Sequence, residues 1–155
     1  MKPARLTLLC VAIVSNAALL ASYLVTGVRA SDFGNFPRPL WGYALLTASI
    51  AYVANLAFVG VAVADPKLSA EDAYIIAACV FLYYALQVFF IPLVRASTQH
   101  AKSRWMARSM LIACVIPMAV VAGIGVRMGR VAGALAIIPA AHVLINDAIL
   151  YGFLF

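Results

Sequence analysis

The sequence predicts an all-α membrane protein whose helices cross the bilayer five times and pack into one compact bundle. Two observations predict this class. Apolar residues make up 66% of the 155 residues and charged residues 10%, whereas a soluble domain carries about 25% charged residues. The apolar residues also gather into five long blocks, and nearly all charges lie between them. The blocks cover approximately residues 6–28, 40–64, 73–94, 110–126 and 131–155.

Each block is expected to be a helix. About 18 apolar residues are enough for a helix to cross roughly 30 Å of hydrocarbon. Lipid offers no partner to backbone polar groups, so a spanning segment must be a helix or part of a closed barrel. The runs show no alternation of polar and apolar residues, which favours helices. We therefore expect a single five-helix transmembrane domain over residues 1–155.

The first block follows Lys2 and Arg5 and is longer than the 7–15 apolar residues of a secretory signal, so we expect it to remain as a helix. Pro37 and Pro39 forbid a regular helix in the first connection. That connection is either an aromatic anchor at headgroup depth, with Trp41 at its end, or a lid over a cavity.

The later connections carry distinct signals. Ser69 followed by Asp72 resembles a capping box that begins the third helix. The basic stretch 95–108 is long enough for a short interfacial helix against lipid headgroups. The last two helices are expected to form a hairpin about residues 127–130. Small residues four apart predict close helix packing there. They are Ala119, Gly123, Gly125, Gly129 and Gly133.

The net charge of +6 does not indicate nucleic-acid binding, because the Lys and Arg residues lie at the helix ends. Basic residues divide almost evenly between the two sides, five on the side of the N-terminus and six on the other. The dense group between Arg95 and Arg108 favours a cytoplasmic position for its side. The membrane itself is not defined by the sequence.

Polar residues inside the apolar blocks are the candidate site residues, because a polar side chain in hydrocarbon must find a partner. Asp147 matters most, since an ionised carboxylate at the bilayer centre costs roughly 2.5 kcal/mol or more. It must be protonated, paired or facing a wet cavity. The others are Asn16, Asn55, Gln87, His142 and Asn146.

His142 and Asn146 are four residues apart and share a helix face. On an α-helix Asp147 lies about 140° from His142, so we expect that the three do not all point the same way. They either form hydrogen bonds to Asn16, Asn55 or Gln87 that lock the bundle, or line a ligand pocket or proton path, or dock another subunit.

Enzymatic activity is not expected, because no catalytic or metal-binding motif is present in the sequence. The cysteines, Cys10, Cys79 and Cys114, lack CxxC spacing and are expected to be small buried hydrophobic residues.

Three segments resemble the translocator protein family, also known as the tryptophan-rich sensory proteins. Pro39-Leu40-Trp41-Gly42 is similar to the family segment that opens helix 2. Ala85-Leu86-Gln87 with Pro92 is similar to its helix 3 segment, and residues 135–139 are similar to its entry to helix 5. The chain departs from the family in having two tryptophans and Ala140 after Pro139. The resemblance implies a pocket for porphyrin- or sterol-like ligands within the bundle.

We therefore expect a protein that binds or moves a small apolar ligand in an intramembrane pocket. The alternatives are a small accessory subunit of a respiratory or photosynthetic complex, and proton or ion conduction through Asp147. The expected partners are the lipid bilayer and an apolar small molecule, with other membrane subunits or a second copy of the chain as further candidates. The predicted pocket residues are Trp41, Asn55, Tyr84, Gln87, His142, Asn146 and Asp147.

Overall fold

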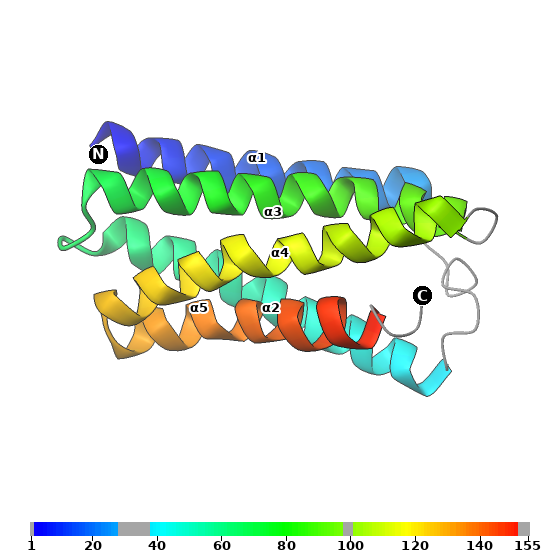
Figure 1. Ribbon diagram of the computed structural model, residues 1–155. Helices are drawn as coiled ribbons and strands as arrows, with labels where there is room; N and C mark the ends of the chain where they lie inside the picture. The colour runs from blue at the N-terminus through cyan, green and yellow to red at the C-terminus, as the bar shows by residue number, and fades with distance from the viewer. Residues whose placement is uncertain (1, 28–37, 98–100, 152–155) are drawn as a thin grey trace.

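The computed structural model describes residues 2–27, 38–97 and 101–151, and within these ranges the chain is helical apart from short connections (Figure 1). No strand occurs in the described ranges, which confirms the all-α class. The last apolar block is divided, because its second half is a π-helix, η2, that continues directly from α5. The helices are α1 (Pro3–Thr26), α2 (Arg38–Ala64), α3 (Ala70–Ser97), α4 (Ala101–Met128), α5 (Arg130–His142) and η2 (Val143–Tyr151).

The helices form a bundle in which α3 packs between α1 and α4, and α5 packs between α4 and α2 (Figure 1). Contact between α1 and α2 is slight. Completely buried side chains at the centre include Leu8, Phe58, Ile76 and Val121. The bundle is therefore held by apolar side chains that α1, α2, α3 and α4 all contribute to one core.

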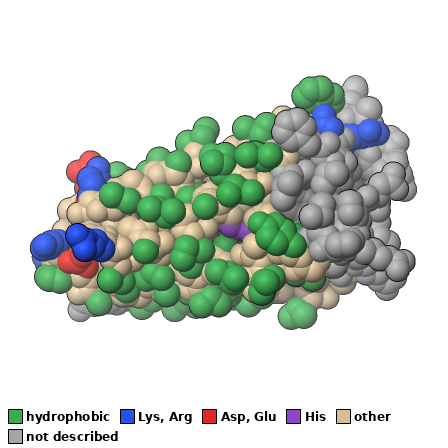
Figure 2. Space-filling model, turned by 90° about the horizontal axis from the view of Figure 1, so that it is seen from below, with side chains coloured by type: hydrophobic (Ala, Val, Ile, Leu, Met, Phe, Trp, Pro, Cys, Tyr) green, Lys and Arg blue, Asp and Glu red, His purple; other side chains and the backbone are tan. Residues whose placement is uncertain are grey.

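The outer surface is apolar along the length of the helices and charged at the ends. Val25 and Leu24 are 87% and 83% exposed. Figure 2 shows hydrophobic side chains along the described part of the flank, Lys and Arg toward both ends, and Asp and Glu at one end. Soluble proteins rarely expose so large a continuous apolar surface. Within the described residues, five helical stretches are long and apolar enough to cross a membrane, as the sequence predicted.

The close approach of α4 and α5 depends on Gly125. A Cβ atom at Gly125 would lie 2.6 Å from the Cβ of Ala136 and 3.0 Å from the carbonyl oxygen of Ala132. Gly129 forms the turn between the helices with a φ of +136°, a conformation that favours glycine. Gly123, in contrast, has no neighbour within 4 Å of its Cβ position. The predicted small-residue seam thus includes Gly125 but not Gly123.

The third connection is shorter than the sequence suggested. Helix α3 continues past Pro92 to Ser97, and α4 begins at Ala101 rather than near residue 110. Hydropathy falls at Arg104 and Arg108, but both residues are good helix formers, so the helix extends beyond the apolar block. The predicted interfacial helix is therefore the first part of α4. The Ser69–Asp72 cap is present, with the Asp72 N–H donating to Ser69 Oγ at 3.0 Å.

Two arginines attach α1 at both of its ends. Arg5 donates to the carbonyl oxygens of Val63 and Asp65, at 3.1 and 2.6 Å, where α2 ends. Arg95, near the end of α3, donates to the carbonyl oxygens of Thr26 and Gly27 at 2.7 and 3.1 Å. The last carbonyls of a helix have no partner within the helix and carry partial negative charge, so a guanidinium group satisfies them well.

Replacing Arg5 with alanine is expected to lower the free energy of unfolding by about 2 kcal/mol, because charged hydrogen bonds to helix-end carbonyls are lost. Unfolding of the detergent-solubilised protein with increasing mole fraction of SDS measures this change. Arg127→Ala is the matched control. The Arg127 side chain is 69% exposed and pairs with Asp72 at 2.8 Å, and an exposed pair contributes less than about 1 kcal/mol. Equal losses in the two variants would contradict the expectation.

Candidate ligand-binding site

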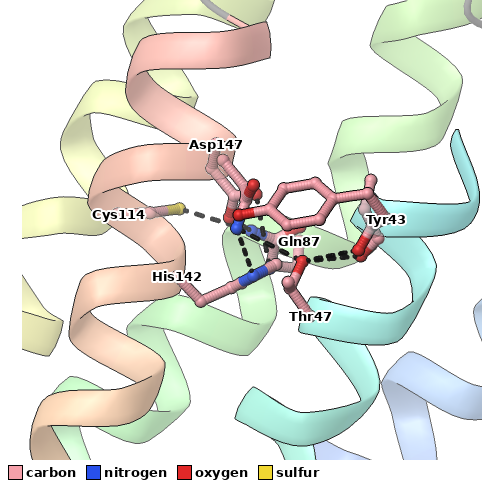
Figure 3. Close-up of polar contacts among 8 residues, drawn as sticks. Tyr43, Thr47, Gln87, Cys114, His142 and Asp147 are labelled. Atoms are coloured by element: carbon pink, nitrogen blue, oxygen red, sulfur yellow. Dashed lines mark hydrogen bonds and ion pairs between the residues drawn. The ribbon is translucent and has the colours of Figure 1, made fainter. Parts of the chain in front are cut away.

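A group of polar side chains lies inside the bundle where α2, α3, α4 and η2 meet (Figure 3). We call it the polar cluster. Its members come from helices far apart in the sequence, so only the folded bundle assembles them. Tyr43 of α2 points toward the cluster (Figure 3). The cluster consists of Thr47, Gln87, Cys114, His142, Asn146 and Asp147.

Asp147 is buried, and its carboxylate lies between the amide of Gln87 and the imidazole of His142. Gln87 Nε2 donates to Asp147 Oδ2 at 3.1 Å, and the same nitrogen lies 4.0 Å from Cys114 Sγ. His142 Nε2 is 3.7 Å from Asp147 Oδ1. No Lys or Arg in the described part of the chain forms an ion pair with this carboxylate. The imidazole is therefore the closest group that can balance its charge.

The π-helix explains how His142 and Asp147 come together, and it corrects the sequence-based expectation. Their separation of five residues places them on different faces of an α-helix. In a π-helix the hydrogen bonds run from i to i+5, so residues five apart lie one above the other. Since η2 begins directly after His142, the two side chains meet within 3.7 Å. π-Helical turns are rare and are frequent at functional sites.

Asn146 links the imidazole to α2. Its Nδ2 lies 2.8 Å from His142 Nδ1 and donates to Thr47 Oγ1 at 3.3 Å. Because an amide nitrogen carries only donors, the Nδ1 of His142 must accept, and a neutral ring then carries its proton on Nε2, on the side of Asp147. The Oδ1 atom of Asn146 is buried without a hydrogen-bond partner among the described residues.

Two predicted site residues belong to a separate group, one turn away on α3. Asn55 Nδ2 donates to the Tyr84 hydroxyl at 2.8 Å, and both side chains are buried. Asn16 is also buried, and its Nδ2 donates to the carbonyl oxygen of Ala12 at 2.6 Å. Asn55 and Tyr84 thus form a neutral pair that joins α2 to α3, at a distance from the hydrogen bond between Gln87 and Asp147.

The structure therefore brings together Gln87, His142, Asn146 and Asp147, whereas Asn55 and Tyr84 lie apart from them. Trp41 belongs to α2, but its side chain lies outside the described residues.

Sequence reasoning missed Thr47, which joins the cluster through Asn146, and treated Cys114 only as a buried hydrophobic residue. Thr47 carries little sequence signal, because a threonine within an apolar helix usually bonds to its own backbone. It does so here too, donating to the carbonyl of Tyr43. Cys10 contradicts the expectation of buried cysteines, since it is exposed on the outer surface.

The polar cluster reaches the lipid-facing surface at one edge. The side chain of His142 is 9% exposed, so part of it reaches the surface between the outward-facing hydrophobic side chains. Figure 2, which views the bundle from the side of α2 and α5, shows a small His surface on this flank. A molecule dissolved in the bilayer could meet this imidazole without passing through either end of the bundle.

The apolar flank, the charged ends and the spanning helices define an integral membrane protein that crosses the bilayer several times. Among the described residues, no group of three His, Cys, Asp or Glu side chains could hold a metal ion. Comparison of the chain with known protein families, curated proteins and solved structures finds no match.

Proposed function

We propose that this protein binds a small molecule dissolved in the membrane, without converting it chemically, and that the molecule places a polar end at the polar cluster. The observation that carries the proposal is the His142–Asp147 pair, buried within the membrane-spanning region at 3.7 Å and open to the lipid face at the imidazole. Ionisable side chains at membrane depth are uncommon and generally serve a function.

A purely structural role explains this cluster less well. A buried charged pair contributes little net stability, because removing two charged groups from water offsets their attraction. The neutral Asn55–Tyr84 pair already provides a buried hydrogen bond between α2 and α3. A carboxylate and an imidazole can carry charge and bind a polar ligand, whereas a contact that only joins two helices requires neither property. Their position at the edge of the bundle supports a role in binding.

The family resemblance suggests the first ligands to test, which are porphyrins and sterols. Both have a large apolar body and a polar edge or hydroxyl that can accept or donate a hydrogen bond. Such a ligand would keep its body among the outward-facing hydrophobic side chains and direct its polar group toward His142. The accessory-subunit and ion-conduction functions predicted from the sequence remain predictions that no contact between described residues favours.

Saturable binding of protoporphyrin or tritiated cholesterol to the purified protein in mild detergent is the expected result. His142→Leu is expected to weaken that binding about tenfold, equivalent to the loss of one good hydrogen bond. Tyr84→Phe is the matched control, because it removes a buried polar group from the same bundle outside the polar cluster. Equal binding by wild type and His142→Leu would contradict the proposed function, and so would the absence of saturable binding by these ligands and by every other membrane-soluble probe tested.

A further inference from the structure

The polar cluster contains more hydrogen-bond acceptors than donors. Its amide donors are already in use, since Gln87 Nε2 donates to Asp147, and Asn146 Nδ2 contacts both Thr47 and His142. The Thr47 hydroxyl donates to the carbonyl oxygens of Tyr43 and Ala44, at 3.0 and 3.1 Å. Of the ring and amide N–H groups in the cluster, the one left is that of the His142 ring, which points toward Asp147 at a distance too long for a good hydrogen bond.

One buried acceptor of the cluster is left without a partner among the described residues. Asn146 is 3% exposed, and its Oδ1 accepts no hydrogen bond from a described residue. The imidazole of His142 lies 3.7 Å from Asp147 Oδ1, which is longer than a good hydrogen bond. A buried acceptor that lacks a donor costs free energy. A ligand that supplies hydrogen-bond donors would therefore bind the polar cluster more favourably than one that supplies acceptors.

The orientation of the Asn146 amide follows from its neighbours. Because the Thr47 hydroxyl proton is directed to the backbone carbonyls of its own helix, the Thr47 oxygen must accept from Asn146. Only the Nδ2 atom can donate, so Oδ1 is the unpartnered atom. Asn146 and Asp147 consequently offer acceptors from consecutive positions of η2.

We propose that the ligand of this site is a lipophilic amine, which is an apolar molecule with a protonated amino group. An ammonium group carries several donors and a positive charge, so it can serve both the Asn146 oxygen and the Asp147 carboxylate. It also supplies the cation that this carboxylate lacks within the membrane. This inference rests on the proposed function and names the chemical class of the ligand.

Three probes that share an adamantylmethyl body test the inference on the full-length protein in phosphatidylcholine nanodiscs. Adamantylmethylamine has charge and donors, adamantylmethanol has a donor without charge, and the trimethylammonium analogue has charge without donors. Equilibrium dialysis, corrected with empty nanodiscs, measures binding. The amine is expected to bind saturably and at least about tenfold more tightly than the alcohol, as expected for hydrogen bonds to a charged group. The trimethylammonium analogue is expected to bind more weakly than the amine.

Asp147→Asn keeps the shape of the side chain and should abolish the preference for the amine over the alcohol. Asn146→Leu should weaken binding of the amine, but the amine should still bind more tightly than the alcohol because of its charge. Tyr84→Phe should bind all three probes like the wild type. Equal binding of amine and alcohol by the wild type, or a preference that survives Asp147→Asn, would overturn the inference. The wild-type comparison does not depend on the folding of any variant.

The failures of the two proposals are distinguishable. If porphyrin or sterol still binds in a His142-dependent manner but the amine has no advantage, the proposed function stands and the amine inference is wrong. If no probe and no sterol or porphyrin binds saturably, both are wrong.

Discussion

Gly125→Ala is expected to lower the free energy of unfolding by about 2–3 kcal/mol, the upper part of the range for overpacked cores. The added methyl group would stand 2.6 Å from the Cβ of Ala136 and 3.1 Å from Cε2 of Phe58. A Cβ atom cannot rotate away from its own backbone, so α4 and α5 must separate to accept it. SDS-induced unfolding in mixed micelles, followed by circular dichroism, measures the change.

Gly123→Ala provides the control for this prediction. It makes the same chemical change on the same helix, but no atom lies within 4 Å of the new methyl group. Alanine is a better helix former than glycine by up to about 1 kcal/mol, so Gly123→Ala should be neutral or stabilising. Adding Ala136→Gly to Gly125→Ala should recover part of the loss, because it removes the shortest contact. Similar losses for Gly123→Ala and Gly125→Ala would refute this account of the α4–α5 interface.

Gln87→Leu is expected to destabilise the protein by about 2 kcal/mol or more, because it removes a hydrogen bond to a buried charged group. Leucine has a similar size, so the effect should come from Asp147, which loses its 3.1 Å donor. The double variant Gln87→Leu/Asp147→Leu should lie within about 1 kcal/mol of the wild type, because replacing both partners with apolar groups leaves no unpaired charge. The measurement is again SDS-induced unfolding.

Asn55→Leu is the comparison for Gln87→Leu. It breaks a buried hydrogen bond between neutral groups, from Asn55 to the Tyr84 hydroxyl, and should cost only about 1 kcal/mol. A double variant as unstable as Gln87→Leu would show that the carboxylate is not the source of the loss. It would also show that the Gln87 side chain matters through its packing.

The number and type of the helices could be predicted from the sequence, because runs of apolar residues of bilayer length have few alternative structures. The boundary of α4 could not, since the helix continues through Arg104 and Arg108 after the apolar signal ends. Hydropathy predicts which residues contact the hydrocarbon of the bilayer. Hydrogen bonding and helix propensity, in contrast, determine where a helix begins. The hairpin at Gly129 was predictable because its turn falls between two apolar blocks.

The candidate site was predictable in composition but not in geometry. Gln87, His142, Asn146 and Asp147 were identifiable as rare polar residues within apolar blocks. Their grouping required the packing of α3 against α4 and of α5 against α2. The face shared by His142 and Asp147 depends on a π-helix. No simple sequence pattern predicts a π-helix, and α-helical spacing places Asp147 on a different helix face from His142.

The π-helix also has a consequence for the evolution of this chain. Its wider turn holds more residues in a given length than an α-helix does. Deleting a single residue from 143–146 could therefore be absorbed by a return to ordinary α-helical hydrogen bonds, without shortening the span noticeably. The carboxylate would then lie four residues after His142, and the residues beyond it would stay on the helix faces that they occupy now. A distant homologue could thus carry the same imidazole and carboxylate at an offset of one, and an alignment that forbids gaps within helices would miss the correspondence.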